Sequence, residues 1–298
     1  MILLTGASGF IGSHFLDRAP AGLRIRCLVR AASASKIKKT PSIEILEGDL
    51  LSPDTVEKAV QNVEIIIHLG ALLRKSRPED VYKVNVEGTR LLLEKAQKAN
   101  VRRFVFVSTE NAMREDLSDA YASSKRTAED LVSGFKNSLI LRPCFVYGPG
   151  DTHGLGRLVE LANNSAVVPL FGGLKSQIQP IFIEDMVQYL TLSLQNDLRG
   201  AYVLAGPEKM NLNDFVRKVC ELKKIKRFFL PVPHPLLKLL AVACDSLAPS
   251  SGWGMNPLNN IYKSRTYPID KTVQDFKYSP RGITEGLNQW FGKSQEKL

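Results

Sequence analysis

The stretch MILLTGASGFIG, Met1 to Gly12, decides the fold expected of this chain. It opens with an apolar run, Ile2–Leu4, that is typical of a buried parallel strand, and Ser13–Arg18 resembles the start of a helix. Three glycines lie between them: Gly6, Gly9 and Gly12. Such glycines let the backbone approach a pyrophosphate, to which the helix N-terminus offers free N–H groups. The spacing is G-x-x-G-x-x-G rather than G-x-G-x-x-G, and glycines also serve plain turns, but the strand–helix junction favours a dinucleotide site.

Length, cysteine usage and hydropathy narrow the class of protein. The chain has 298 residues, enough for a large core in one domain or two. Its four cysteines are scattered without metal-ligand spacing, so we expect reduced thiols, no disulfide framework and no metal site. The first strand begins at Met1, which leaves no room for a signal peptide, and no apolar run reaches membrane-spanning length. We therefore expect a cytoplasmic protein.

The formal net charge is +10. This charge permits binding to nucleic acid or to an anionic membrane, but it equally suits phosphate-bearing ligands or a solvated basic surface. We expect a small-molecule substrate, no nucleic-acid partner and a homodimer.

A second predicted strand, Arg24–Val29, ends at Arg30, about 20 residues past the glycines, where a nucleotide-binding fold holds the adenosine ribose. An acid there would bind the 2′-hydroxyl of NAD, but no Asp or Glu occurs from Arg18 to Ile43. Arginine binds a 2′-phosphate through charge-assisted hydrogen bonds, so Arg30 favours NADP, with NAD as the alternative. An exposed basic loop would also explain Arg30.

Two further strands are predicted, Ile43–Leu46 and Glu64–Leu69. Asp49, after the first of them, either accepts a hydrogen bond from the adenine amino group or caps a helix over Pro53–Val60. The small-residue turn after the second strand lets the chain pass close to a cofactor. His68 follows an apolar run and is expected to be structural. The cofactor-binding residues expected here are Asp49, Leu50, Leu69, Gly70 and Ala71.

Residues with acid–base chemistry follow a fifth predicted strand, Phe104–Val107, which ends in Ser108 and Thr109. Tyr121 and Lys125, in the motif YASSK, are four residues apart in a predicted helix and therefore share one face. A lysine ammonium beside a phenol lowers the phenol pKa, which makes Tyr121 a candidate acid and base. The hydroxyl of Thr109 or Ser108 could hold the substrate oxygen.

Together these motifs resemble the extended short-chain dehydrogenases/reductases, the branch with NAD(P)-dependent epimerases and dehydratases. The matching stretches are TGASGFIG, GDL (48–50), HLGA (68–71), NVEGT (85–89), VST (107–109), YASSK, LRPCFVYGPGD (141–151), IFIED (181–185) and YSPRGITEGL (278–287). The resemblance implies an α/β fold, a doubly wound parallel Rossmann sheet with a smaller C-terminal substrate-binding subdomain. We place the Rossmann domain at 1–149 with 178–206 returning to it, and the subdomain at 150–177 and 207–298.

The resemblance also implies roles for individual residues. It assigns Thr109, Tyr121 and Lys125 as the catalytic set, with Lys125 also holding the nicotinamide ribose. The expected cofactor-binding residues then include Gly6, Gly9, Phe10, Ile11, Gly12, Arg30, Lys125, Pro143 and Val146. The implied reaction passes a hydride between nicotinamide and a carbon bearing a hydroxyl or ketone.

Departures from the family pattern bear on the substrate. Dehydratases have Thr-Asp-Glu after the fifth strand, whereas this chain has Thr109-Glu110-Asn111, so dehydration is disfavoured. Gln179-Pro180 stands where sugar-nucleotide epimerases often place an arginine. Family frequency alone favours a nucleotide-activated sugar. The alternatives are an apolar ketone of the hydroxysteroid or flavonol type and a non-catalytic NADP-binding subunit, which would have no reason to keep both Tyr121 and Lys125.

The remaining stretch has fewer motifs. Asn213 is expected to cap a helix over Asp214–Leu222. The segment 230–249 reads PVPHPLLKLLAVACDSLAP from Pro231 onward, an apolar helix bounded by prolines and too short to span a bilayer. It either packs over the substrate pocket or makes a peripheral contact with a membrane.

Overall fold

A computed structural model describes residues 1–73, 76–117, 119–152, 154–247 and 254–295, and in it the chain forms two compact units. The first comprises Met1–Pro143, Glu184–Leu204 and Lys271–Tyr278, and the second comprises Cys144–Ile183, Ala205–Asp270 and Ser279–Leu298. Residues 271–278, expected in the smaller subdomain, pack with the first unit, whereas residues 144–149, 178–183 and 205–206, expected in the Rossmann domain, belong to the second unit.

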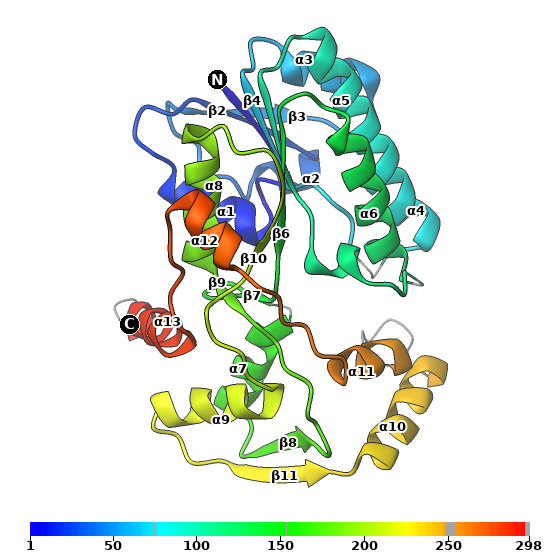
Figure 1. Ribbon diagram of the computed structural model, residues 1–298, viewed down its shortest axis with the longest axis vertical. Helices are drawn as coiled ribbons and strands as arrows, with labels where there is room; N and C mark the ends of the chain where they lie inside the picture. The colour runs from blue at the N-terminus through cyan, green and yellow to red at the C-terminus, as the bar shows by residue number, and fades with distance from the viewer. Residues whose placement is uncertain (74–75, 118, 153, 248–253, 296–298) are drawn as a thin grey trace. The chain divides into compact units, whose positions relative to one another are not determined.

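The described part of the first unit contains a sheet of seven parallel strands in the order β10-β6-β5-β4-β1-β2-β3 (Figure 1). The strands are β1 (Ile2–Thr5), β2 (Ile25–Val29), β3 (Ile43–Glu47), β4 (Ile65–His68), β5 (Arg103–Val107), β6 (Ser138–Pro143) and β10 (Gly200–Leu204). The strand order reverses between β1 and β4, and open α/β sheets bind ligands at the carboxyl edge of such a point. The predicted doubly wound parallel sheet is confirmed.

Helices cover both faces of this sheet (Figure 1). One face carries α3 (Pro53–Val60), α4 (Pro78–Tyr82), α5 (Gly88–Lys98) and α6 (Ala120–Ser133), with a π-helical turn η1 (Lys83–Glu87) joining α4 to α5. The other carries α1 (Phe10–Arg18), α8 (Ile183–Gln195) and α12 (Asp270–Phe276). Two short helices, α2 (Ala31–Ala34) and η2 (Glu110–Met113), follow β2 and β5.

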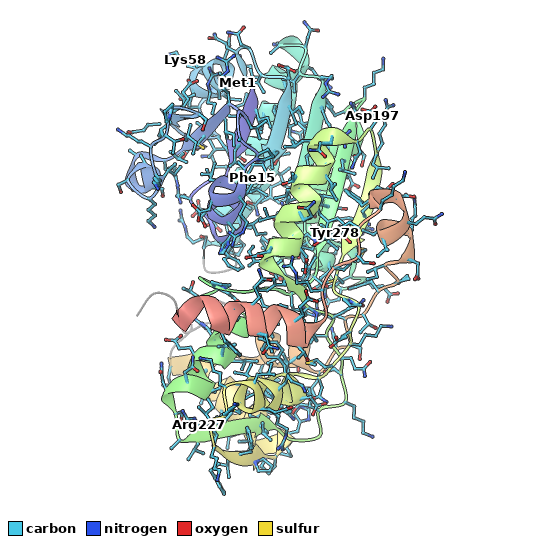
Figure 2. All side chains as sticks on the ribbon, turned by 90° about the vertical axis from the view of Figure 1, so that its left-hand side faces the viewer. Met1, Phe15, Lys58, Asp197, Arg227 and Tyr278 are labelled. Atoms are coloured by element: carbon cyan, nitrogen blue, oxygen red, sulfur yellow. The ribbon has the colours of Figure 1, made fainter. Side chains whose placement is uncertain are left out.

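The hydrophobic core of the first unit explains why these elements pack as they do. Under α3, α5 and α6 it joins apolar side chains of strands and helices, among them Leu3, Ile66, Phe104, Val56, Leu92 and Val132. On the opposite face Phe15 of α1 is fully buried (Figure 2). Strand residues buried on both faces account for the unbroken apolar runs in the sequence.

The helix α12 brings the late part of the chain back to the first unit. Its Phe276 ring meets Tyr189 of α8 and Tyr202 of β10 edge-on, with centroids 5.1 and 5.3 Å away. Tyr278, labelled in Figure 2, donates its hydroxyl to Asp185 Oδ1 at 2.5 Å. These aromatic contacts fix the edge of the sheet at β10.

The second unit has two small parallel strand pairs, β7 (Val146–Tyr147) with β9 (Ile181–Phe182) and β8 (Val167–Phe171) with β11 (Phe228–Val232). Its helices are α7 (Gly154–Asn164), α9 (Leu212–Leu222), α10 (His234–Leu247), α11 (Met255–Ile261) and α13 (Ile283–Gln295). The Tyr147 ring packs on Phe182 and Phe215, 5.5 and 5.9 Å between centroids. In the described ranges no helix is both long and apolar enough to cross a membrane.

The start of α9 corrects one expectation. The N-cap is Asn211, whose side chain accepts a hydrogen bond from the Asp214 amide, so the predicted cap at Asn213 is wrong. Asn213 lies inside the helix, and its amide group binds both backbone groups of Phe171, at 2.9 and 3.0 Å. Its side chain therefore ties α9 to the end of β8.

Gly6 permits a close approach between the glycine turn and the chain that follows β4. It lies in the left-handed region, with φ of +71°, and a Cβ there would stand 2.7 Å from Gly70 N and from Leu69 C. An L-residue would therefore be strained in its own backbone and would also collide with the chain that leaves β4.

We predict that Gly6→Ala destabilises the chain more than Gly22→Ala. Gly22 shares the left-handed φ, at +81°, but a Cβ there meets no atom of the described chain within 4 Å. The control thus measures the conformational cost alone, about 1–2 kcal/mol. Gly6→Ala adds overpacking of about 1–3 kcal/mol. Urea unfolding checks this, and equal losses of unfolding free energy would contradict it.

Candidate active site

The turn from β1 to α1 forms an open cradle of backbone groups. Among the described residues no side chain caps α1 at Gly9, so its first N–H groups remain available. A Cβ at Gly12 would lie 2.3 Å from Gly6 O, which shows how closely the helix packs on the turn. Phe10 and Ile11, half-buried, begin the helix. Free N–H groups at a helix N-terminus beside a bare glycine turn fit a pyrophosphate.

The residues predicted to surround the adenosine lie at neighbouring strand ends. Arg30 is exposed directly after β2, and the Gly48 amide after β3 donates to Val29 O at 2.8 Å. Asp49 is exposed, and its Oδ1 accepts a hydrogen bond from the Leu51 amide at 2.8 Å. The structure therefore gives Asp49 a local turn contact and brings it to the same corner of the sheet as Arg30.

The end of β4 is tied to β1 by a buried histidine. His68 is fully buried, and burial lowers its pKa to about 3, so the ring is neutral. Its Nδ1 lies 2.6 Å from Thr5 Oγ1, which also accepts the Gly70 amide at 3.0 Å, and its Nε2 lies 2.9 Å from Thr89 Oγ1. Thr89 donates its own proton to Asn85 O, so Nε2 of His68 must carry the ring proton and Thr5 must donate to Nδ1. The expected structural role of His68 is confirmed.

The same chain of hydrogen bonds continues to the helix that carries YASSK. Asn85, buried in η1, binds both backbone groups of Leu72 and donates to Ser124 Oγ at 3.0 Å. Ser124 in turn donates to the carbonyl of Tyr121 at 2.9 Å. A continuous polar path therefore runs from β1 to Tyr121. The motif NVEGT alone predicted no role for Asn85, because the partners of this residue are distant in sequence.

Lys125 is buried, with a relative exposure of 2%. Its Nζ donates to Val107 O at 2.7 Å and lies 3.9 Å from the centroid of the Phe106 ring. Burial lowers the pKa of Lys125 to about 7, and the Glu129 carboxylate partly opposes this. Tyr121 lies one turn earlier on α6, half-buried, after the N-cap Asp119. The contact with Val107 brings the lysine to the strand end from which Ser108 and Thr109 continue.

Two hydroxyl groups follow β5. Thr109 caps η2, and its Oγ1 accepts hydrogen bonds from the backbone and side-chain N–H groups of Asn111, at 3.3 and 3.0 Å. The proton of that hydroxyl is therefore free of these two contacts. The buried Ser108 Oγ has no hydrogen-bond partner among the described residues. Such an unsatisfied buried group is costly and fits a site that a ligand completes.

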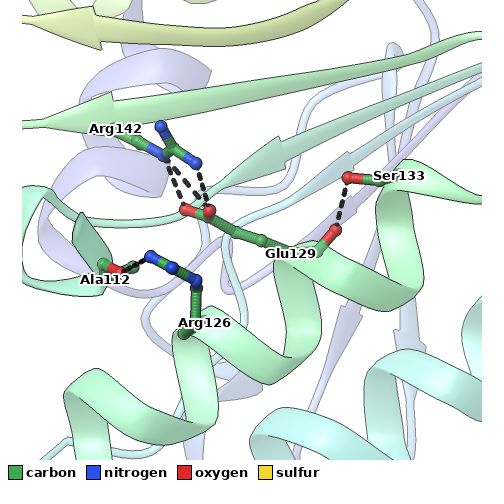
Figure 3. Close-up of polar contacts among 5 residues, drawn as sticks. All are labelled: Ala112, Arg126, Glu129, Ser133 and Arg142. Atoms are coloured by element: carbon green, nitrogen blue, oxygen red, sulfur yellow. Dashed lines mark hydrogen bonds and ion pairs between the residues drawn. The ribbon is translucent and has the colours of Figure 1, made fainter. Parts of the chain in front are cut away.

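A partly buried ion pair that the sequence did not predict lies on the same helix as Lys125 (Figure 3). Glu129, one turn beyond Lys125, accepts three hydrogen bonds from Arg142 of β6, the shortest at 2.6 Å. Arg126 of the same helix donates to Ala112 O at 2.7 Å. These contacts hold α6 on β6 and η2. The spacing of four between Lys125 and Glu129 could have suggested a shared face, but not the partner on β6.

The remaining residues predicted to bind the cofactor or the substrate are divided between the two units. Leu69, Gly70 and Ala71 follow β4 and are half-buried, and Pro143 ends β6, all in the first unit. Val146 lies in β7 of the second unit. Gln179, also in that unit, is 2% exposed. Its amide donates to Gly206 O at 2.8 Å and accepts the Tyr267 amide at 2.9 Å, so both of its ends bind backbone.

Comparison with known proteins identifies the family. The sequence model described as the NAD dependent epimerase/dehydratase family matches residues 2–205. The chain belongs to this family. The family expected from the motifs is therefore confirmed, and with it the class of NAD(P)-binding oxidoreductases and epimerases.

Individual relatives of this epimerase/dehydratase family member differ in substrate. The chain is 34% identical to a ceramide reductase of Caulobacter vibrioides, covering 96% of this chain and 92% of the relative. It is 24% identical to a UDP-glucose 4-epimerase of Vibrio cholerae, covering 80% of each. The crystal structure of gox2253 superimposes with a TM-score of 0.78 at 26% identity, covering 100% of this chain and 98% of that one.

The buried lysine makes stability depend on pH. An unfolded lysine has a pKa of about 10.4, whereas folding lowers that of Lys125 to about 7. Between these values the unfolded state binds more protons, so the unfolding free energy rises with pH. From pH 7 to 9 the rise is about 2 kcal/mol.

We predict that Lys125→Met abolishes this rise in the cofactor-free protein, whereas Lys98→Met, at an exposed position of α5, keeps it. Urea unfolding at several pH values measures the effect. An unchanged pH dependence in Lys125→Met would contradict burial of the ammonium.

Proposed function

We propose that this chain is an NADPH-dependent oxidoreductase that interconverts a ketone and an alcohol on an apolar, lipid-like substrate. We infer an apolar substrate from the 34% identity to a ceramide reductase, which extends along nearly all of both chains. Gln179 supports it, because a buried amide engaged with backbone at both ends offers no cation to a substrate diphosphate.

The residues present fit a dinucleotide, because the N-terminus of α1 has no side-chain cap and the glycine turn carries no side chains that would block a pyrophosphate. Gly6, Gly9, Phe10, Ile11 and Gly12 would hold the pyrophosphate, and Arg30 the 2′-phosphate. When bound, the cofactor supplies or accepts a hydride at its nicotinamide ring. Lys125 would also bind the nicotinamide ribose.

Side chains of the protein would transfer the proton that accompanies the hydride. In the reducing direction Tyr121 gives its phenolic proton to the ketone oxygen, which leaves an alcohol once the carbon has received hydride. The Lys125 ammonium lowers the phenol pKa and so stabilises the phenolate that remains. Thr109 donates its free hydroxyl proton to the same substrate oxygen and orients it. Asn111 stands where dehydratases carry the second acid, so we infer that the chain does not remove water.

A second candidate is hydride transfer on a nucleotide-activated sugar, which the match to a UDP-glucose 4-epimerase favours. The buried, doubly bonded Gln179 argues against it. A non-catalytic NADP-binding subunit is a third candidate, and the presence of both Tyr121 and Lys125 argues against that one.

We predict that the protein oxidises NADPH with a long-chain aliphatic ketone in detergent and that Tyr121→Phe lowers this turnover by about 10²–10⁴-fold. The NADPH dissociation constant should change little, because the cradle and Arg30 are untouched. Stopped-assay chromatography with UDP-glucose serves as the competing test. Conversion of the sugar nucleotide without reduction of any apolar ketone would transfer the assignment to the second candidate, and undiminished turnover in Tyr121→Phe would remove the phenol from the mechanism.

Cofactor preference is tested by reversing charge at either end of β2. Arg30→Asp should weaken NADPH binding by about 10–100-fold and NADH binding far less, since it removes a charge-assisted contact of about 1.5–3 kcal/mol. Arg24→Asp makes the same charge change at the exposed opposite end of the strand and should leave the NADPH-to-NADH ratio unaltered. Calorimetric titration measures both, and an equal effect of the two variants would contradict a 2′-phosphate contact at Arg30.

A further inference from the structure

The helix α10 turns its apolar side outward. Only Ala241 of its 14 residues is buried. Leucines recur at spacings of three, four and eleven residues, which places them on one side of a helix. They are Leu236, Leu239, Leu240 and Leu247, with exposures of 46, 66, 51 and 86%. A soluble helix ordinarily buries such a stripe, so this one is built to contact something outside the unit.

The strand pair before α10 exposes apolar side chains as well. β8 and β11 are in register at Val167 and Phe228, which are 43 and 65% exposed. Leu230, two residues further on β11, projects to the same side and is 46% exposed. We call these three residues and the four α10 leucines the apolar face.

Contacts within the second unit hold the apolar face in this conformation. The His234 ring at the start of α10 stacks on Tyr262, 4.2 Å between centroids. Near its other end Asp245 accepts the Met255 amide, the first of α11, at 2.9 Å. The buried Ala241 side faces inward. Because these contacts fix the orientation of α10, its leucines point outward.

Basic residues border the apolar face. The run Lys223-Lys224-Ile225-Lys226-Arg227 leads directly into Phe228, with Lys224 and Lys226 exposed. Arg227 instead binds the carbonyls of Ala162 and Asn163 and fixes the end of α7. Exposed lysines beside leucine and phenylalanine are the composition of an interfacial membrane contact.

We propose that the apolar face of the second unit docks on an anionic phospholipid bilayer. The leucines and Phe228 enter the boundary between headgroups and acyl chains, while Lys224 and Lys226 meet the lipid phosphates. A second copy of the chain is the less suitable occupant, because apposing two such faces brings like-charged lysines together. The proposal deepens the proposed function, on which it rests for one point only: the bilayer is then the source of the lipid-like ketone.

The test is co-sedimentation of the full-length protein with vesicles that contain no ketone. We expect binding to vesicles of phosphatidylcholine with 30% phosphatidylglycerol, chosen as about physiological anionic content, and binding at least tenfold weaker to phosphatidylcholine alone. The double substitution Leu239→Glu with Leu240→Glu should lower binding to the anionic vesicles at least tenfold. Leu73→Glu, at a leucine 51% exposed in the first unit, controls for the effect of an added carboxylate away from α10 and should bind as the unaltered protein does.

The side chains changed in α10 are exposed, so folding should be preserved, and circular dichroism and the NADPH dissociation constant check this. Absence of binding by the unaltered protein, or equal binding by the Leu239/Leu240 variant and the Leu73 control, would overturn the proposal. A variant that becomes monomeric in light scattering while still binding vesicles would assign the face to a second copy. Vesicle binding without reduction of any ketone would refute the proposed function alone, and ketone reduction without vesicle binding would refute the docking alone.

Discussion

A buried line of hydrogen bonds joins the strands of the first unit to the helix of the YASSK motif. It begins at Thr5, passes through His68 and Thr89 to Asn85, and reaches Tyr121 through Ser124. Each of these buried groups would cost free energy if left unpaired, so the ends of the first and fourth strands and the helix of the YASSK motif must keep one arrangement. The neutral His68 accepts at one nitrogen and donates at the other, and the carbonyl of Asn85, which can only accept from Thr89, fixes which nitrogen carries the proton.

Lys125 lies beside this line under a different constraint. A buried ammonium is stabilised by a nearby carboxylate, and Glu129 is only one turn away. Arg142 already binds that carboxylate with three hydrogen bonds, so Glu129 only partly offsets the cost of burying the lysine charge. The ammonium therefore keeps a pKa near neutrality in the ligand-free protein. Polar groups of a ligand would favour its charged form, which is the form that our proposal requires to stabilise a phenolate at Tyr121.

Local pattern was enough to predict most of the first unit from sequence. The strand–glycine–helix junction, the strand ends and the Tyr121–Lys125 spacing depend on neighbours within a few residues, and the structure contains each of them. Contacts between distant residues escaped prediction, as with Asn85 to Ser124 and Glu129 to Arg142, because nothing in either stretch specifies its partner. The cap at Asn213 failed for a related reason. Asn211 and Asn213 are equally good caps locally, and only the contact of Asn213 with Phe171 separates them.

The orientation of α10 shows the limit of hydrophobic patterning most clearly. Its sequence is apolar on several sides, so periodicity alone permits either a buried helix or one that faces a nonaqueous partner. Only the packed structure shows that Ala241, and not the leucine stripe, is the buried side. The residues that we propose for the hydride and proton chemistry lie in the first unit, whereas Gln179 and the outward leucines belong to the second unit. We therefore infer that the substrate preference proposed for this chain depends on the second unit, through the charge and hydrophobicity of a few of its side chains.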